Sequence, residues 1–151
     1  MGFWLEVVTL VVPGFNDSDE ELRQVAEFLA QISPDIPWHV NAFHPDYKMH
    51  ASSSALPADL KRAAEIGRDA GLHYVYAGNL NGHAGNLENT HCVGCGELVI
   101  RRRGGQVLDD LLTRDGCCPA CSRKIPGVWA DPLHRPISRR GDLPWPVRYC
   151  G

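Results

Sequence analysis

The sequence predicts an α/β protein in three parts: a βαβαβ body over residues 1–86, a small β module over 87–129, and an irregular tail over 130–151. Apolar, β-branched runs alternate with segments of helical periodicity, which is typical of parallel βαβ units. Two Cys-x-x-Cys loops follow the last of these runs. The tail is rich in Pro and Arg, a composition that predicts disorder.

The first βα unit is predicted from a change of period. Residues 4–12, "WLEVVTLVV", indicate a strand buried on both faces, and Pro13-Gly14 ends it. A helix follows over 16–33, with Ser18 and Glu21 as a capping box. Its buried stripe is predicted to comprise Leu22, Val25, Ala26, Leu29 and Ile32.

The second unit repeats this order. Residues 38–43 indicate a strand, Pro57 fits the first turn of a helix, and Gly71 is placed to end it in a left-handed conformation. A third strand is predicted over 72–77. The second helix is expected to bury Leu60, Ala63, Ala64 and either Gly67 or Ala70.

The segments that leave the carboxyl ends of these strands should meet at one edge of the sheet, where α/β proteins bind ligands. His44 stands out there, because no turn requires a histidine. The Asn and Asp residues have turn formation as an alternative role. The polar residues expected at this edge are Asn16, Asp17, His44, Asp46, Asn79 and Asn81. Three strands leave two open edges, so we also expect a partner, self-association or the rest of a larger barrel.

The cysteine loops predict a metal site. Cys92-x-x-Cys95 and Cys118-x-x-Cys121 enclose 22 residues that resemble a hairpin, with 98–103 and 106–112 as strands around Gly104-Gly105. Four thiolates at this spacing are typical of a structural zinc ribbon, which leaves the metal no open position. Cys118 is preferred to the adjacent Cys117, whose spacing would be one residue longer. A redox disulfide and an iron site with the same ligands are the alternatives.

The amino-terminal segment argues for a cytoplasmic protein. It lacks a basic region, carries Glu6 within its apolar run, and is too short to span a bilayer. Paired Cys-x-x-Cys loops in that compartment favour metal over disulfides. The net charge of −3 gives no sign of a nucleic-acid or acidic-lipid partner.

An ordered series of motifs adds a family resemblance. The stretches "TLVVPGFNDSDEEL", "PDIPWHVNAFHPDYKM", "AGLHYVYAGN", "ENTHCVGCGELVIRRR" and "CPACSRKIPGVW" span about Trp4 to Trp129. Together they resemble the C-terminal half of AmmeMemoRadiSam-system radical SAM enzymes, relatives of the pyruvate formate-lyase-activating enzymes. The resemblance implies a partial (β/α) barrel with S-adenosylmethionine and a [4Fe–4S] cluster.

The cluster ligands do not carry over, because the family's Cys-x-x-x-Cys-x-x-Cys motif occurs nowhere in this chain. By resemblance, Val12 and His44 become candidate S-adenosylmethionine contacts, with Asn16 and Asp46 as neighbours. The alternative for His44 is a loop histidine bonded to nearby backbone. No catalytic residue is assigned. The expected partner is the missing N-terminal barrel half, supplied as a split-gene product or lost by truncation, or a second copy of the chain.

Two functions follow from the sequence. In the first, the chain is the substrate-side portion of a radical SAM enzyme with structural zinc, inactive alone. In the alternative it is a non-catalytic zinc-ribbon adaptor for protein or nucleic acid, with Arg101, Arg102 and Arg103 as a basic strip. A solvated hairpin strand is the favoured explanation of those arginines.

Overall fold

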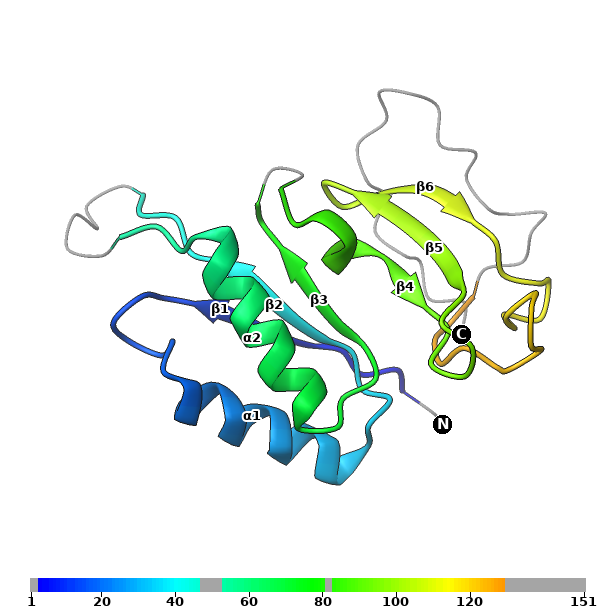
Figure 1. Ribbon diagram of the computed structural model, residues 1–151, viewed down its shortest axis with the longest axis horizontal. Helices are drawn as coiled ribbons and strands as arrows, with labels where there is room; N and C mark the ends of the chain where they lie inside the picture. Colours follow the sequence, from blue (N-terminus) through cyan, green and yellow to red (C-terminus); the bar gives the residue numbers. More distant parts are fainter. Residues whose placement is uncertain (1–2, 47–52, 81–82, 130–151) are drawn as a thin grey trace.

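The computed structural model describes residues 3–46, 53–80 and 83–129. Three parallel strands form one sheet, in the order β1-β2-β3, and three antiparallel strands form a second, in the order β4-β5-β6 (Figure 1). The predicted α/β fold, a βαβαβ body followed by a β module around the cysteine loops, is confirmed. The predicted tail over 130–151, with Cys150, lies outside the described residues, and so does Asn81.

In the first βα unit, the strand is shorter than the sequence predicts, whereas the helix matches the prediction. Strand β1 is Val7–Val11, and helix α1 is Asp19–Ile32 with Ser18 as its N-cap. The Ser18 hydroxyl accepts a hydrogen bond from the Glu21 N–H at 3.3 Å and donates one to the Glu21 carboxylate at 2.6 Å. Acidic residues in the first turn favour the positive end of the helix dipole.

The second unit continues the parallel sheet. Strand β2 is Trp38–Ala42, helix α2 is Pro57–Asp69, and strand β3 is Val75–Gly78. Gly71 has a φ of 101°, as expected for a left-handed residue beyond the helix end. Gly67 lies on the Trp38 ring so closely that a Cβ there would stand 2.8 Å from Trp38 Cε3.

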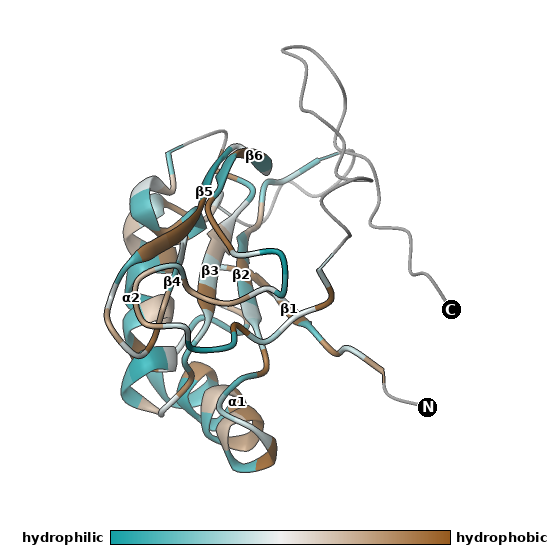
Figure 2. Ribbon diagram, turned by 90° about the vertical axis from the view of Figure 1, so that its right-hand side faces the viewer, coloured by the Kyte–Doolittle hydropathy of each residue, from teal (hydrophilic) through white to brown (hydrophobic). Residues whose placement is uncertain are grey.

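Both helices cover the same face of the sheet (Figures 1 and 2). Alternate strand residues point toward them, because side chains along a strand alternate between faces. The fully buried members of this core include Val11, Leu22, Ala26, Trp38, Val40, Ala42, Leu60, Ala63 and Ala64. The body is therefore a two-layer structure with its apolar core between sheet and helices.

The opposite face of the sheet is largely open at β1. Val8 and Leu10 are 61% and 46% exposed there. On α1, Val25 and Ile32 were predicted to be buried, and this prediction is wrong: they are 37% and 59% exposed. The sheet and α2 cover only part of the apolar arc of α1, so these two side chains stay partly exposed.

The β module follows a 3-10 helix, η1 (Gly85–Glu88), which spans the boundary predicted at residue 86. Strands β5 (Leu98–Arg103) and β6 (Gln106–Asp110) form the predicted hairpin, and a short strand β4 (Thr90–His91) pairs with β5. Gly104 and Gly105 have φ values of 58° and 78°, as a tight hairpin turn requires.

The β module packs against the open face of β3. Its core contains Cys92, Val99, Ile100, Leu112, Cys118 and Ile125, and this core extends to Tyr74 with Tyr76 and Trp129 at its border. The Tyr76 hydroxyl and the Arg102 guanidinium both bond the Thr90 hydroxyl, at 2.9 and 2.7 Å. The metal-site module is thus joined to the sheet by an apolar core and a polar network.

Within the described ranges, none of the helices has the length and apolar character needed to cross a membrane.

Candidate metal centre and strand-end site

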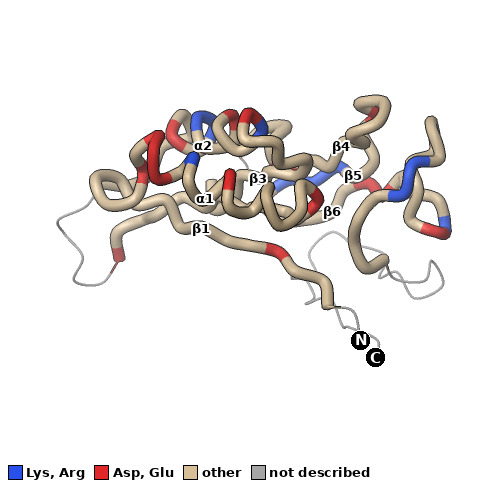
Figure 3. Tube along the Cα trace, turned by 90° about the horizontal axis from the view of Figure 1, so that it is seen from below, with Lys and Arg blue, Asp and Glu red and all other residues tan. Residues whose placement is uncertain are grey.

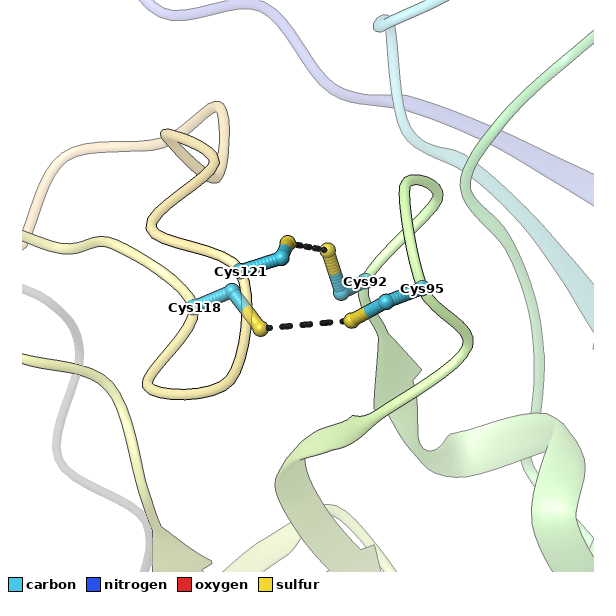
Figure 4. A group of neighbouring side chains, drawn as sticks. All are labelled: Cys92, Cys95, Cys118 and Cys121. Carbon is cyan, nitrogen blue, oxygen red and sulfur yellow. Dashed lines mark hydrogen bonds between the residues drawn. The ribbon is translucent and has the colours of Figure 1, made fainter.

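Four cysteine sulfurs meet at one end of the β module (Figure 4). The Sγ atoms of Cys92, Cys95, Cys118 and Cys121 all lie within 4.8 Å of one another. Cys92 and Cys121 are 3.5 Å apart, and Cys95 and Cys118 are 3.6 Å apart. Because a disulfide bond is about 2.05 Å long, these pairs are free thiols rather than disulfides.

The two cysteine loops have the same backbone conformation. In the first, the N–H of Cys92 bonds the Glu97 carbonyl, and the N–H of Gly96 bonds the Cys92 carbonyl, each at 2.8 Å. In the second, Cys118 bonds Arg123 and Ser122 bonds Cys118 in the same pattern, at 2.8 and 2.9 Å. Each loop thus offers one buried and one exposed sulfur to a common point.

The matching conformation of the two loops shows which of the adjacent cysteines, Cys117 or Cys118, belongs to the four-sulfur group. Cys118 occupies the place that Cys92 has in the first loop and is fully buried. Cys117 corresponds to His91: each precedes the loop and pairs with the residue seven positions later, His91 with Leu98 and Cys117 with Lys124. The Cys117 thiol is directed instead to the Asp115 carbonyl, at 3.9 Å.

Ser122 and Gly96 share a left-handed conformation, with φ values of 61° and 78°. This conformation turns the chain back after the second cysteine of each loop and frees the loop amides to point toward the sulfurs. Glycine adopts it without strain, whereas Ser122 does so at a cost.

The loop amides also favour thiolate formation. Burial raises the pKa of the Cys92 thiol, but hydrogen bonds from the Gly94 and Cys95 N–H groups and from neighbouring thiols outweigh it and bring the pKa to about 7. At Cys95 a backbone bond from Glu97 lowers the pKa, and the surrounding thiols overcome this and raise it to about 12. The loop amides therefore favour the thiolate of Cys92, which is the form of cysteine that binds a metal.

The geometry fits a tetrahedral metal ion. Zinc–sulfur bonds of about 2.3 Å in a tetrahedron place the sulfurs about 3.8 Å apart. The two shortest sulfur pairs, at 3.5 and 3.6 Å, are already near that spacing. The cluster could hold a metal such as zinc, and four thiolates would leave it no position for a substrate or water.

The second group of predicted residues lies at the carboxyl end of β1. The Asn16 amide accepts from the Val12 N–H at 2.8 Å and donates to the Leu10 carbonyl at 3.0 Å. Asp17 accepts from the Gly14 N–H at 2.8 Å. Both side chains stabilise the turn after β1 through hydrogen bonds to its backbone, which is the turn-forming role considered for them from the sequence.

His44 lies at the end of β2, exposed, and its Nε2 is 2.8 Å from the Asn79 carbonyl at the end of β3. A carbonyl oxygen only accepts, so Nε2 carries the hydrogen, and Nδ1 of the neutral ring remains an acceptor. The Asn79 side chain returns a bond to the Ala42 carbonyl at 2.7 Å, from a backbone with a φ of 60°.

The structure therefore brings the predicted residues to one edge of the sheet as two separate pairs. Val12 and Asn16 bond each other, and His44 bonds Asn79. Asp46 is exposed in the loop after β2. The partner role of Asn79 toward His44 was not predicted, and its place after the third strand was the signal available in the sequence.

Comparison with known proteins finds a relative of this chain. The chain is 36% identical over 129 residues to an uncharacterized protein of Methanocaldococcus jannaschii, and the match covers 83% of this chain. It covers 38% of that protein, so the chain spans well under half the length of its relative. No family model matches the chain. No solved structure matches it.

Proposed function

We propose that this chain is the C-terminal portion of a radical SAM enzyme, in which it supplies the last barrel strands and a structural zinc site. It lacks the family's Cys-x-x-x-Cys-x-x-Cys cluster motif and is inactive alone. The observation that carries the proposal is the sheet itself: a parallel β1-β2-β3 order with helices on one face and an opposite face that is open at β1. This is the arrangement of a barrel wall, whose helices lie outside and whose inner face lines the site.

The relative's length supports the same reading. Its match to this chain accounts for 38% of it, which leaves room for the remaining strands of a barrel. The motif series from Trp4 to Trp129 supports the family, because its members occur in order along nearly all of the described chain. S-adenosylmethionine, when bound to a reduced cluster, supplies a 5′-deoxyadenosyl radical that abstracts hydrogen from a substrate.

In this proposal the residues of the chain bind and orient rather than react. His44, held through Nε2 by the Asn79 carbonyl, presents Nδ1 as an acceptor for a ligand amino group. The Val12 side chain, half-buried beside the turn that Asn16 fixes, contributes apolar contact. Asp46 lies in the same loop as His44 and is its neighbour at the ligand.

The adaptor alternative has less support. Arg101 pairs with Asp109, whereas Arg102 turns to the other side of β5, over the Tyr76 ring at 5.5 Å. Arg103 alone of the three is exposed without a partner among the described residues. A contiguous basic strip for nucleic acid is therefore not formed by these three side chains.

The test is S-adenosylmethionine binding by a single-chain fusion. The part of the Methanocaldococcus jannaschii protein outside the match is joined through a flexible linker to residue 1 of the full chain, and binding is measured by anaerobic calorimetry. We expect the fusion to bind S-adenosylmethionine and the chain alone to bind it very weakly or not at all. In the fusion, His44→Ala should weaken binding by about fivefold, since a hydrogen bond contributes about 1 kcal/mol.

His83→Ala is the matched control, because His83 is an exposed loop histidine whose side chain has no partner among the described residues. It should leave the affinity unchanged. If the His44→Ala fusion bound S-adenosylmethionine as tightly as the unmodified fusion, the role assigned to His44 would be wrong. A fusion that binds no S-adenosylmethionine would refute the proposed function.

A further inference from the structure

A group of exposed apolar side chains lies on β1, α1 and the residues beside them. Eight large apolar side chains are exposed between residues 3 and 32: Phe3, Leu5, Val8, Leu10, Phe15, Val25, Phe28 and Ile32. Soluble proteins seldom leave so many in one region without a partner. Val8 and Leu10 are on β1, the edge strand of the sheet away from β3, and Val25, Phe28 and Ile32 are on α1, which packs beside α2 (Figure 1).

On α1 the exposed apolar residues form a line. Val25, Phe28 and Ile32 follow i, i+3, i+7 spacing and so lie on one side of the helix. Phe28 is 62% exposed and Ile32 is 59% exposed. This stripe is the size and shape that a second helix would cover.

On β1 the outer edge is open along its first part. In a parallel ladder the N–H and C=O of one residue point to the same neighbour, and Val7 and Val11 use theirs toward β2. The backbone groups of Val8 and Leu10 therefore point outward. Of these outward-pointing groups, only the Leu10 carbonyl has a hydrogen-bond partner among the described residues, which is the Asn16 side-chain amide.

The Asn16 amide does at this edge what a peptide group of a neighbouring strand would do. It accepts from the Val12 N–H and donates to the Leu10 carbonyl, two residues apart on the same edge. An added strand would thus pair with Val8 and the Leu10 N–H, and it would end where Asn16 begins. The open edge has a defined length and register.

We infer that β1 and α1 form a docking surface for one further βα unit of a partner polypeptide. Its strand pairs in parallel with the outer edge of β1, and its helix packs on Val25, Phe28 and Ile32. The right-handed crossover rule places α1 between β1 and β2, so the helix of a preceding unit lies on the free side of α1. One unit therefore covers both open surfaces at once, which neither a lone strand nor a lone helix does.

Two observations identify the occupant. The relative has 62% of its length outside the match (100 − 38), which is enough chain for such a unit. The exposed surface of α1 also carries Glu20, Glu21 and Glu27 against Arg23 (Figure 3), whereas Asp19 pairs with Arg62 of α2. The docking helix should therefore carry Lys or Arg beside its apolar stripe. This inference rests on the proposed function, because it takes the chain to be part of a larger α/β barrel.

The test uses the full chain co-expressed with the separate polypeptide that corresponds to the unmatched part of the Methanocaldococcus jannaschii protein. We expect a 1:1 complex by native mass spectrometry. In it, the amides of Val8 and Leu10 should exchange at least about tenfold more slowly than in the chain alone. A complex that leaves these two amides unprotected would overturn the inference, and so would a homodimer that protects them without the partner.

Variants separate the surface from general misfolding. Phe28→Asp should weaken the complex by at least about tenfold, because it places a charge in the covered stripe. Gln31→Asp adds the same charge at an exposed position outside the stripe and should have little effect. Val8→Pro should also block docking, because the Val8 N–H is unused within the body and proline is tolerated on an open edge. Circular dichroism should show all three variants folded. Equal losses of affinity for the partner in Phe28→Asp and Gln31→Asp would contradict the assignment of Val25, Phe28 and Ile32 as the docking stripe.

The single-chain fusion separates this inference from the proposed function. Protection of Val8 and Leu10 in a fusion that binds no S-adenosylmethionine would leave the docking surface standing and refute the function. Binding of S-adenosylmethionine without protection at β1 would refute the docking surface and leave the function standing.

Discussion

Replacement of Cys118 by serine tests the ligand assignment at the metal centre. The Cys118 sulfur is fully buried and lies 3.6 Å from that of Cys95, so its loss removes one of four metal bonds at a place water does not reach. The backbone bonds of Cys118 to Arg123 and Ser122 do not involve the sulfur, so the loop conformation is kept. A metal held at a thousandfold excess over its dissociation constant stabilises the native state by about 4 kcal/mol. We expect Cys118→Ser to lose bound zinc and most of that free energy.

The assay is zinc content together with urea unfolding, followed with and without a chelator. Cys117→Ser is the matched control, because its thiol lies outside the four-sulfur group and it should keep both zinc and stability. The wild-type chain should fall to the stability of Cys118→Ser when the chelator is added. Zinc retained by Cys118→Ser and lost by Cys117→Ser would refute the assignment.

Three further predictions concern the body. Tyr74→Phe should leave the free energy of unfolding unchanged or raise it by up to about 1 kcal/mol, because it removes a buried hydroxyl that has no hydrogen-bond partner among the described residues. Tyr76→Phe should instead lower the free energy of unfolding by about 1 kcal/mol, since the Tyr76 hydroxyl bonds Thr90. Gly67→Ala should lower it by about 1–3 kcal/mol despite the better helix propensity of alanine, because the new Cβ would lie 2.8 Å from the buried Trp38 ring; a stabilised variant in denaturant unfolding would contradict this packing. A hydrogen bond from His39, opposed by partial burial, lowers the pKa of Glu6 below 4.5, so its contribution to stability is present above that pH and is lost as the pH falls through the lowered value. The stability of Glu6→Gln should therefore differ from that of wild type near neutral pH, and the difference should disappear as the pH falls below the lowered pKa of Glu6. A difference that is constant with pH would show that the charge of Glu6 makes no contribution.

The elements themselves were predictable, because each has a local cause. Ser18 begins α1, Pro57 begins α2, and Gly71 ends it, and these residues act through neighbours a few positions away. The hairpin around Gly104 was equally clear. The match of Cys118 to Cys92 also followed from spacing, because the two loops repeat one short conformation.

The remaining features depend on contacts distant in sequence. Val25 and Ile32 continue the apolar stripe of α1, and nothing local distinguishes them from Leu22, which the sheet covers. The short strand β4 exists because β5 is beside it, and Thr90 and His91 have no strand pattern of their own. The bond of His44 to Asn79 joins the ends of two strands, so only their pairing brings it about.

Metal and sulfide analysis of the purified full-length chain, combined with its native mass, tests the central claim most directly. The account predicts about one zinc per chain, bound by four thiolates, with no labile sulfide. Stoichiometric iron and sulfide with a reducible cluster absorbance would contradict it, because the four-cysteine site would then hold the redox centre that the account places outside this chain.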